Sequence, residues 1–361
     1  MVLAVLRGCM LKGRRIAVIF TASILGGHEL MTVAHLSRYK KKGIEITCYI
    51  PFNNKKLSEL LQVSAINHEF HDVRHRNIEI IHAFLNPRHI FHAVSFLAKI
   101  KKRYDFSFVI QGDIEFGAVF INAGKILGMK NIISYLPYTH SFKKMDSWAP
   151  SLKDFFAKFV YKNCNFFFTI CDATAKDIII KNSNAAVRIL ENFVARPEIS
   201  EIRGVGYEFI PSSDTLKVVM AGRVLFRQKG QDILINALKN IKFPLELRVL
   251  GDGPDLKRLR ELAANLSPNI EVIFLGWKNN VWADSKDIDF IVVPSRYEGV
   301  PLIMLESLAR NIPVISPARD GMINYLKDDS LYNTGSADFE AYELSKKISD
   351  FYFKRERKKT T

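Results

Sequence analysis

The chain has 361 residues, 48% of them hydrophobic, and its formal net charge is +15. This length is too great for one ordinary domain and suits two, and the composition excludes a disordered or fibrous protein. The four cysteines, Cys9, Cys48, Cys164 and Cys171, show neither zinc-site spacing nor the density of a disulfide framework, so we expect free thiols in a reducing cytosol.

The charge and the apolar runs limit the partners. No run reaches the roughly 18 apolar residues needed to cross a bilayer, and the apolar start, residues 1–6, is shorter than the core of a secretory signal. We therefore expect a cytoplasmic protein. The basic clusters, for example residues 99–103 and 354–359, attract anionic partners. No nucleic-acid-binding motif accompanies them, so nucleic acid is not expected.

Short β-branched runs alternate with longer helical patterns through the chain. In the first half we predict strands at 15–20, 44–50, 106–110, 131–135 and 166–170, with helices at 29–41, 89–103 and 152–162. In the second half we predict strands at 216–221, 245–250, 270–275, 289–294 and 313–316, with helices at 230–238, 254–264, 301–310 and 338–352.

Strands separated by helices form parallel sheets with right-handed crossovers. The sequence therefore predicts an α/β fold with two doubly wound, Rossmann-like domains. We place the first at 1–195 and the second at 215–345, joined by a linker at 196–214 that lacks periodicity and contains Pro197, Gly204, Gly206 and Pro211. Residues 346–361 are predicted to form a helix and a basic tail that packs back on the first domain.

The strongest functional motif is PSRYEGVPLIMLE at 294–306. A predicted strand ends at Pro294, a loop follows, and Pro301 suits the first position of a helix. The N–H groups and dipole of a helix start favour phosphate, and ligands of doubly wound folds bind at this edge of the sheet. Glu298 and Glu306 can face one pocket there and bind hydroxyls of a sugar and a ribose. Alternatively, Glu306 forms a surface ion pair with Arg310, four residues on.

A second motif, AGRVLFRQKG at 221–230, places two cations on a loop between a strand and a helix. Arg223 and Lys229 can converge on a diphosphate, the first as a bidentate fork and the second as a point charge. Each charge-assisted bond contributes roughly 1.5–3 kcal/mol. The alternative is that both are solvated loop cations. Asp287 and Asp289 have the spacing of a metal pair, but they enter a buried strand and are predicted to be structural.

In the first half, Gly26 and Gly27 follow the first strand and open the first helix, where they allow close approach of a ligand or form a plain turn. The motif GDIE at 112–115 follows a later strand in the same way. His140 lies just past a strand end, as a functional or a structural histidine. All nine histidines lie at or before His140, so any histidine chemistry comes from the first domain.

Together these motifs resemble the retaining glycosyltransferases of family 4, also called group 1, which have the GT-B fold. Glu298 and Glu306 match that family's two glutamates seven residues apart, and Arg223 and Lys229 match its Gly-Arg … Lys-Gly element. The first glycine-rich loop and the first-domain histidine of the family are matched by Gly26-Gly27 and His140. The resemblance covers nearly the whole chain, most firmly residues 216–325.

The resemblance implies two domains that face each other across a cleft, the first binding the acceptor and the second the nucleotide sugar. It implies that Arg223 and Lys229 hold the diphosphate, that Glu298 lies near the donor sugar and Glu306 near the ribose, and that His140 faces the sugar. The expected catalytic residues are His140 and Glu298. The expected donor-binding residues are Gly26, Gly27, Arg223, Lys229, Gly299, Val300, Leu302 and Glu306. No cofactor or metal is expected.

The implied function is transfer of a sugar, with retention, from a UDP- or GDP-sugar to a glycan or lipid-linked acceptor in surface polysaccharide synthesis. A nucleotide-sugar epimerase on the same fold and a non-catalytic sugar-nucleotide-binding subunit are the alternatives. Helices 89–103 and 152–162 also carry aromatic residues beside lysines. They predict peripheral contact with the anionic inner face of a membrane or, alternatively, ordinary helix core. These aromatic residues are Phe91, Phe96, Phe155, Phe156 and Phe159.

Overall fold

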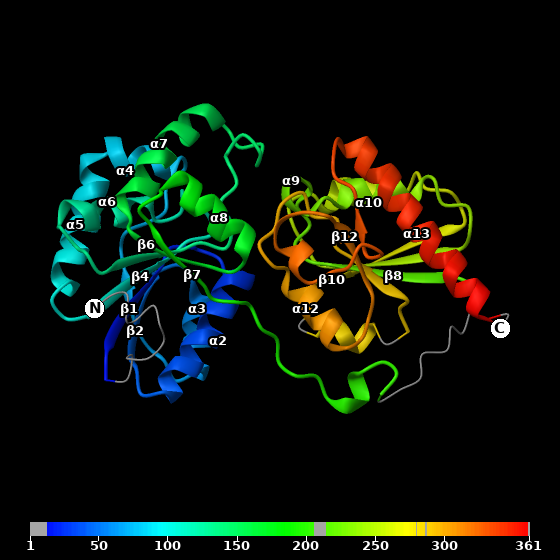
Figure 1. Ribbon diagram of the computed structural model, residues 1–361, viewed down its shortest axis with the longest axis horizontal. Helices are drawn as coiled ribbons and strands as arrows, with labels where there is room; N and C mark the ends of the chain where they lie inside the picture. Colours follow the sequence, from blue (N-terminus) through cyan, green and yellow to red (C-terminus); the bar gives the residue numbers. More distant parts are fainter. Residues whose placement is uncertain (1–12, 206–213, 279, 286, 360–361) are drawn as a thin grey trace. The chain divides into compact units, whose positions relative to one another are not determined.

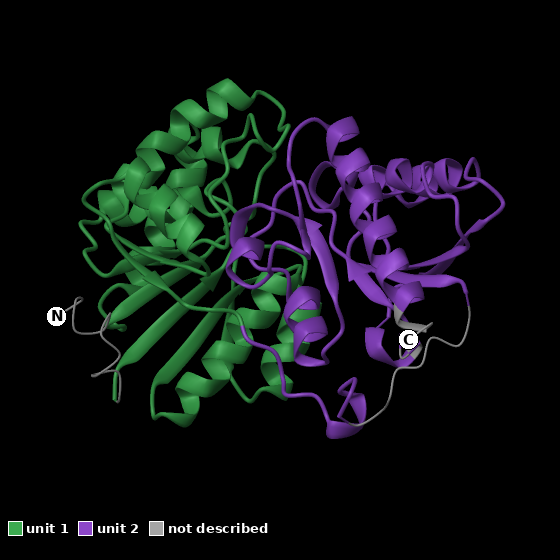
Figure 2. Cartoon of the chain, turned by 45° about the vertical axis from the view of Figure 1, so that its right-hand side comes forward, with its two compact units in different colours: residues 1–192 green, residues 193–361 purple. Residues whose placement is uncertain are grey.

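The computed structural model describes residues 13–205, 214–278, 280–285 and 287–359. The chain divides into two compact units, Met1–Asn192 and Phe193–Thr361, which Figure 2 colours separately. Each unit is built around its own parallel sheet, and each is described by itself below.

The described part of unit 1 contains a seven-stranded sheet in the order β3-β2-β1-β4-β5-β6-β7, and each pair of neighbours is parallel. Figure 1 shows α2 and α3 on one side of this sheet and α4, α5, α6 and α7 on the other. The strands are β1 (Arg15–Phe20), β2 (Glu45–Pro51), β3 (Asn67–His71), β4 (Phe106–Ile110), β5 (Ile132–Tyr135), β6 (Phe166–Thr169) and β7 (Ala186–Ile189). The helices are α2 (Gly27–Lys41), α3 (Lys55–Val63), α4 (Glu79–Leu85), α5 (Pro87–Ile100), α6 (Ala118–Ile126), α7 (Pro150–Asn163) and α8 (Asp172–Lys181).

The described part of unit 2 contains a six-stranded parallel sheet in the order β10-β9-β8-β11-β12-β13. The strands are β8 (Leu216–Ala221), β9 (Leu245–Leu250), β10 (Ile270–Gly276), β11 (Phe290–Val292), β12 (Val314–Pro317) and β13 (Leu331–Tyr332). The helices are α9 (Phe226–Lys229), α10 (Gln231–Leu238), α11 (Leu256–Ala263), α12 (Leu302–Ala309) and α13 (Ala337–Lys359), with 3-10 turns η1 (Ile199–Glu201), η2 (Val281–Asp284) and η3 (Asp320–Asn324).

Both sheets begin with the third, second and first strands of their unit and continue with the fourth onward, which is the doubly wound Rossmann order. The predicted fold class is therefore confirmed for each unit. Parallel sheets covered by helices on both faces need apolar strands throughout, and β1 accordingly buries every residue after Arg15. The strand β3, NHEFH, was not predicted, because it lies at the sheet edge, exposes most of its side chains and carries no apolar run.

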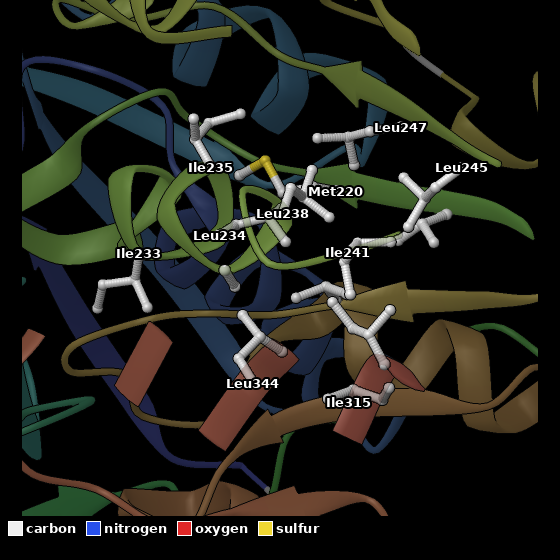
Figure 3. Packing of buried hydrophobic residues seen from close by; sticks show 14 of the residues in the cluster. Met220, Ile233, Leu234, Ile235, Leu238, Ile241, Leu245, Leu247, Ile315 and Leu344 are labelled. Carbon is white, nitrogen blue, oxygen red and sulfur yellow. The ribbon is translucent and has the colours of Figure 1, made fainter. Parts of the chain in front are cut away.

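The core of unit 2 gathers around α10. Its residues Ile233, Leu234 and Leu238 are fully buried and belong to one cluster with strand residues of the sheet, as Figure 3 shows. Leu344, from α13, belongs to the same cluster. This packing fixes α10 and the loop before it against the sheet, which matters for the site below.

The long helix α13 runs without a break across the predicted boundary at 345/346. Its second half packs within unit 2: Ile348 is buried in the unit 2 core, the rings of Phe351 and Phe290 lie 4.6 Å apart, and Arg355 bonds to Asp289 at 3.0 Å. The structure thus shows what this half of α13 contacts within unit 2, and the packing of residues 346–361 on the first domain stays a prediction. Apolar residues spaced three and four apart continue the core-facing stripe of the helix and hold it on its own sheet.

The predicted linker is only partly described, because residues 206–213 lie outside the described ranges. Its earlier part is bonded to unit 2. The main-chain N–H of Arg203 donates to Arg310 O at 3.0 Å, and the Arg203 guanidinium donates to Asp289 O at 3.1 Å. Glu201 forms an ion pair with the Arg310 side chain at 2.9 Å. The chain is thus anchored on unit 2 before β8 begins.

Two smaller expectations can be compared with the structure. Cys48, Cys164 and Cys171 are free, as predicted, and all three are buried, whereas Cys9 lies outside the described residues. Among the helices that the structure describes, none combines the length and the apolar character needed to pass through a membrane.

Candidate active site

The two strongest motifs of the sequence meet at one point of unit 2. The strands β8 and β11 are parallel neighbours at the position where the strand order of the sheet reverses. The loop after β8 carries Arg223, and the loop after β11 carries Glu298. In doubly wound folds, ligands bind at this reversal, beyond the carboxyl ends of the strands. The topology therefore brings both motifs to the place where a ligand is expected.

The two loops are packed against each other through their backbones. Gly230, between α9 and α10, has a φ of +64°, and a Cβ atom there would lie 2.1 Å from Pro294 O. A side chain would therefore force the loops apart, so only glycine fits this junction. The main-chain N–H of Arg296 also donates to Gln228 O at 2.8 Å, which fixes the β11 loop against α9.

The side chain of Arg296 also holds the β8 and β11 loops together. Its guanidinium forms a bidentate pair with Asp232, at 2.6 and 2.7 Å, and also donates to Phe226 O at 2.6 Å. The carboxylate of Asp232 raises the pKa of Arg296, so the guanidinium stays charged. The sequence does not indicate this clamp, because the partners are 64 residues apart and no local pattern relates them.

Lys229 and Glu298 form an ion pair, with Lys229 Nζ donating to Glu298 Oε1. Glu298 is 7% exposed, so the pair is largely shielded from water and interacts more strongly than a surface pair. The main-chain N–H of Glu298 donates to Asp320 Oδ2 at 2.9 Å, which fixes the loop beneath the carboxylate. The structure thus brings together two predicted site residues from separate motifs, the donor-binding Lys229 and the catalytic Glu298.

Arg223 lies on the same edge with an exposed side chain, and its carbonyl accepts a hydrogen bond from Gln231 Nε2 at 2.9 Å. The loop after β9 supports this segment. A Cβ atom at Gly251 would lie 1.9 Å from Gly222 O, and one at Gly253 would lie 2.2 Å from Val224 O. The GDG turn at 251–253 therefore has a structural reason for its glycines, which is close backbone approach to the Arg223 loop.

The start of α12 differs by one residue from the prediction. Pro301 is the N-cap, in an extended conformation, and the helix begins at Leu302. Gly299 and Val300, both buried, lead into it, and Gly299 O accepts from the N–H of Gly321 at 3.0 Å. The first N–H groups of any helix lack intrahelical partners. Because Pro301 has no N–H, the free donors of this turn begin with Leu302.

Glu306 is half-buried on α12, and its Oε2 accepts a hydrogen bond from Trp282 Nε1 at 3.0 Å. The predicted alternative, a surface ion pair with Arg310, is not the arrangement found. The Arg310 guanidinium instead bonds to the carboxylate of Glu201 at 2.9 Å and to the main-chain oxygen of Glu306 at 3.3 Å. The carboxylate of Glu306 is thus oriented by an indole.

Asp287 and Asp289 are held in ion pairs at the start of β11. Asp287 contacts Arg248 at 2.6 Å and Lys217 at 2.6 Å, and the Arg248 hydrogen bond holds the pKa of Asp287 well below its usual range. Asp289 contacts Arg355 at 3.0 Å. The structural role predicted for this pair is confirmed.

In unit 1 the two glycine-containing loops lie on neighbouring strands, β1 and β4, at the corresponding reversal of strand order. Gly26 is the N-cap of α2 and Gly27 its first residue, so the predicted local structure is confirmed. The N–H of Gly26 donates to the carboxylate of Glu29 at 2.9 Å. A capping bond of this kind satisfies the helix start, and the donor-binding role of the two glycines stays a prediction.

The loop after β4 contains a buried polar cluster. Asp113 Oδ1 accepts the N–H of Glu115 at 2.8 Å, and burial together with the charge of Glu115 raises the pKa of Asp113 to about 6. Glu115 pairs with the buried Lys153 of α7 at 2.7 Å. Lys153 was missed from the sequence, because a lysine amid aromatic helix residues gives no signal of burial.

His140 is half-buried in the loop after β5, where its Nδ1 lies 3.3 Å from Lys144 Nζ and its ring stacks near Tyr138, with centroids 6.1 Å apart. The predicted site residues of the first half thus lie in a loop or at the start of α2 in unit 1, and those of the second half lie at the reversal point or on α12 of unit 2.

Comparison with known proteins agrees with the predicted class. Residues 209–359 match the family model described as glycosyl transferases group 1. Over 108 residues the chain is 30% identical to lipopolysaccharide 1,6-galactosyltransferase of Escherichia coli, a stretch that covers 28% of this chain and 30% of that protein. The apo structure of the lipopolysaccharide outer core galactosyltransferase WaaB is similar with a TM-score of 0.67 at 19% identity, covering 95% of this chain and 98% of that one. HepE of Anabaena, solved with UDP and glucose, has a TM-score of 0.70 at 16% identity, covering 93% and 89%.

These likenesses differ in what they show. At such low identity the solved structures show the fold, which is that of GT-B glycosyltransferases. The match to the family model shows that residues 209–359 have the sequence pattern of group 1 glycosyltransferases. Glycosyltransferase is thus the class that all three comparisons name, and it is the class predicted from the sequence. The chain spans 30% of the length of its E. coli relative, so activity and substrates are proposed below.

Proposed function

We propose that the chain is a retaining glycosyltransferase that moves a sugar from a nucleoside diphosphate to a glycan or lipid-linked acceptor in surface polysaccharide synthesis. The observation that carries the proposal is the Lys229–Glu298 pair at the strand reversal of unit 2. A cation held there by the β8 loop can bind a diphosphate. A carboxylate held by the neighbouring β11 loop can accept hydroxyls of the sugar.

The proposed chemistry is stabilisation of the leaving group. When the bond between the sugar and the diphosphate breaks, negative charge grows on the departing phosphate oxygens. Arg223, Lys229 and the first N–H groups of α12 would stabilise that charge, and preorganised groups of this kind supply a large share of catalysis. Two side-chain cations can do this without a metal ion. In the retaining mechanism the leaving phosphate helps to deprotonate the acceptor.

The remaining predicted residues take the roles that the family resemblance gives them. Glu298 would bind the donor sugar and Glu306 the ribose, while Gly299, Val300 and Leu302 line the start of α12. In unit 1, His140 would face the sugar, beside Gly26 and Gly27. HepE was solved with UDP, and the E. coli relative is a galactosyltransferase of lipopolysaccharide. A UDP-sugar and a lipopolysaccharide-type acceptor are therefore the first candidates, with a GDP-sugar next.

A nucleotide screen tests the donor assignment. We expect UDP, GDP or ADP to raise the melting temperature of the chain, because a ligand that binds only the folded state stabilises it. At 100 times the dissociation constant the stabilisation is about 2.7 kcal/mol, which corresponds to a shift of roughly 5–10 °C. CMP, which lacks the diphosphate, is the matched control. If no nucleoside diphosphate moves the transition at millimolar concentration, the proposal fails.

The acceptor side of the proposal includes docking on an anionic membrane through unit 1. On α7, the apolar residues Leu152, Phe155 and Phe159 are exposed along one stripe, next to the exposed Lys158 and Lys162. An exposed aromatic stripe flanked by lysines suits a membrane interface. The other aromatic residues predicted for membrane contact differ in exposure. Phe91 is exposed, whereas Phe96 and Phe156 are half-buried against neighbouring rings. A cytoplasmic location at the inner face of the membrane is part of this proposal.

Sedimentation with vesicles tests the docking surface. We expect the chain to sediment with anionic vesicles at low salt. Phe155→Ser with Phe159→Ser should reduce the bound fraction by about fivefold, because two aromatic side chains that would enter the membrane are lost. Phe52→Ser, which changes an even more exposed phenylalanine elsewhere in unit 1, should leave binding unchanged. Equal binding by wild type and the α7 variant would remove this surface from the account.

A further inference from the structure

We propose that Trp282 is a specificity-determining residue that acts through Glu306. Its indole N–H orients the Glu306 carboxylate so that the site prefers a nucleoside diphosphate with free ribose hydroxyls over one that lacks them. This inference rests on the proposed function, because it requires a nucleotide at Glu306. Trp282 belongs to none of the motifs identified from the sequence.

The hydrogen bond between Trp282 and Glu306 can form in only one direction. Trp282 Nε1 lies 3.0 Å from Glu306 Oε2. An indole N–H can only donate and an ionised carboxylate can only accept, so the direction of the bond is fixed. A bond to a charged acceptor is stronger than a neutral one. This bond uses one acceptor position of Glu306 Oε2, so Glu306 Oε1 is available to accept hydrogen bonds from the hydroxyl groups of a ligand.

The side chain of Trp282 is itself fixed in position by its neighbours, so it can orient the carboxylate of Glu306. It is 7% exposed, and its main-chain N–H donates to Asn280 Oδ1 at 3.0 Å, which caps the short η2 turn. The guanidinium of Arg310 lies over the indole, 4.5 Å from the ring centroid, and Arg310 is fixed by its bond to Glu201 at 2.9 Å. The ring is therefore constrained from its backbone and from one face.

The position of Glu306 fits a ribose when a diphosphate lies at the start of α12. Glu306 is four residues beyond Leu302, and at 1.5 Å per residue this is about 6 Å along the helix axis. A free glutamate samples several rotamers and loses up to about 2 kcal/mol of rotamer entropy when a ligand fixes it. Because the indole bond already restricts the Glu306 side chain, part of this entropy is lost before the nucleotide binds. The hydrogen bonds to the ribose hydroxyl groups therefore contribute more to the affinity.

The test compares two ligands on matched variants. Dissociation constants for UDP and 2′,3′-dideoxy-UDP are measured by calorimetry on wild type, Trp282→Phe and Trp277→Phe. If another base gives the larger thermal shift, its ribose and dideoxy diphosphates are used. Phe keeps the ring and most of the packing but removes the N–H. Trp277, 69% exposed, is the matched control. We expect Trp282→Phe to lower the preference for the ribose form by about fivefold to tenfold, the net effect of one ordinary hydrogen bond.

The outcomes separate the inference from the function on which it rests. A residue that only packs would weaken both ligands equally, so an unchanged preference in Trp282→Phe overturns the inference and leaves the proposed function intact. Failure of wild type to bind any nucleoside diphosphate overturns the proposed function, and the inference with it. Trp277→Phe is expected to behave as wild type.

A second measurement leaves Trp282 in place and so avoids any effect of the substitution on folding. The chain has three tryptophans, so Trp148→Phe with Trp277→Phe leaves Trp282 as the only one, and both replaced residues are exposed. We expect the emission of Trp282 to change when UDP is added and to change much less with the dideoxy form, because the indole senses what binds its carboxylate partner. Equal changes with both ligands contradict the inference.

Discussion

Replacing Lys229 by methionine lowers kcat/KM for the donor by about 100-fold or more, the usual effect of removing one group that stabilises transition-state charge. Lys229 ends α9 and is held beside the β11 loop by its pair with Glu298 and by the Arg296 clamp. Methionine retains the length and apolar character of the side chain, so the loss reports on the charge. Initial rates with increasing donor concentration measure it.

The matched control for this variant is Lys239→Met, at the exposed end of α10, where the lysine bonds to the neighbouring Asn236 at 3.0 Å. It should retain the wild-type rate. If Lys229→Met also retains that rate, Lys229 does not contact the reacting diphosphate, and the donor site must be placed elsewhere.

Replacing Glu298 by glutamine is expected to move turnover and nucleotide affinity in opposite directions. The carboxylate neutralises Lys229 in the free protein and lies close to the proposed diphosphate. Removing its charge frees the lysine and removes a repulsion, so UDP or GDP should bind about threefold to tenfold more tightly, the effect of a charge pair near a partly shielded site. Turnover should still fall by about 100-fold, because the contact with the donor sugar is weakened in the transition state.

Calorimetry with the diphosphate and turnover with the sugar donor measure the two effects separately on one preparation. Glu261→Gln, an exposed glutamate on α11, provides the control and should leave both unchanged. Weaker diphosphate binding by Glu298→Gln would show that the carboxylate supports the nucleotide directly, which contradicts the arrangement proposed here. Wild-type turnover would remove Glu298 from the site.

The parts of the fold and site that depend on local pattern were predictable. Buried strands such as β8, LKVVMA, carry apolar residues on both faces and are followed by a glycine, so both the strand and the loop that carries Arg223 were evident. The motif after β11 was found for the same reason. Once both strands are known to be neighbours, Lys229 and Glu298 come together through topology, as parallel strands place their carboxyl ends on one edge.

The contacts that orient the site were not predictable, because they join residues without a fixed spacing. Arg296 reaches Asp232 across 64 positions, and Trp282 reaches Glu306 across 24. In each case one partner lies in a recognised motif, and the other lies in a segment for which the sequence predicted only a helix or a loop. The polar edge strand β3 was missed because its place in the sheet depends on pairing with β2, which the periodicity of five polar-rich residues does not report.

A crystal structure of the chain with a bound nucleoside diphosphate tests the central claim most directly. The account predicts the diphosphate within hydrogen-bonding distance of Lys229 Nζ and of the first N–H groups of α12, with Arg223 turned toward it and the ribose at Glu306. A diphosphate bound away from the β8 and β11 loops, with Lys229 still paired only with Glu298, would contradict it.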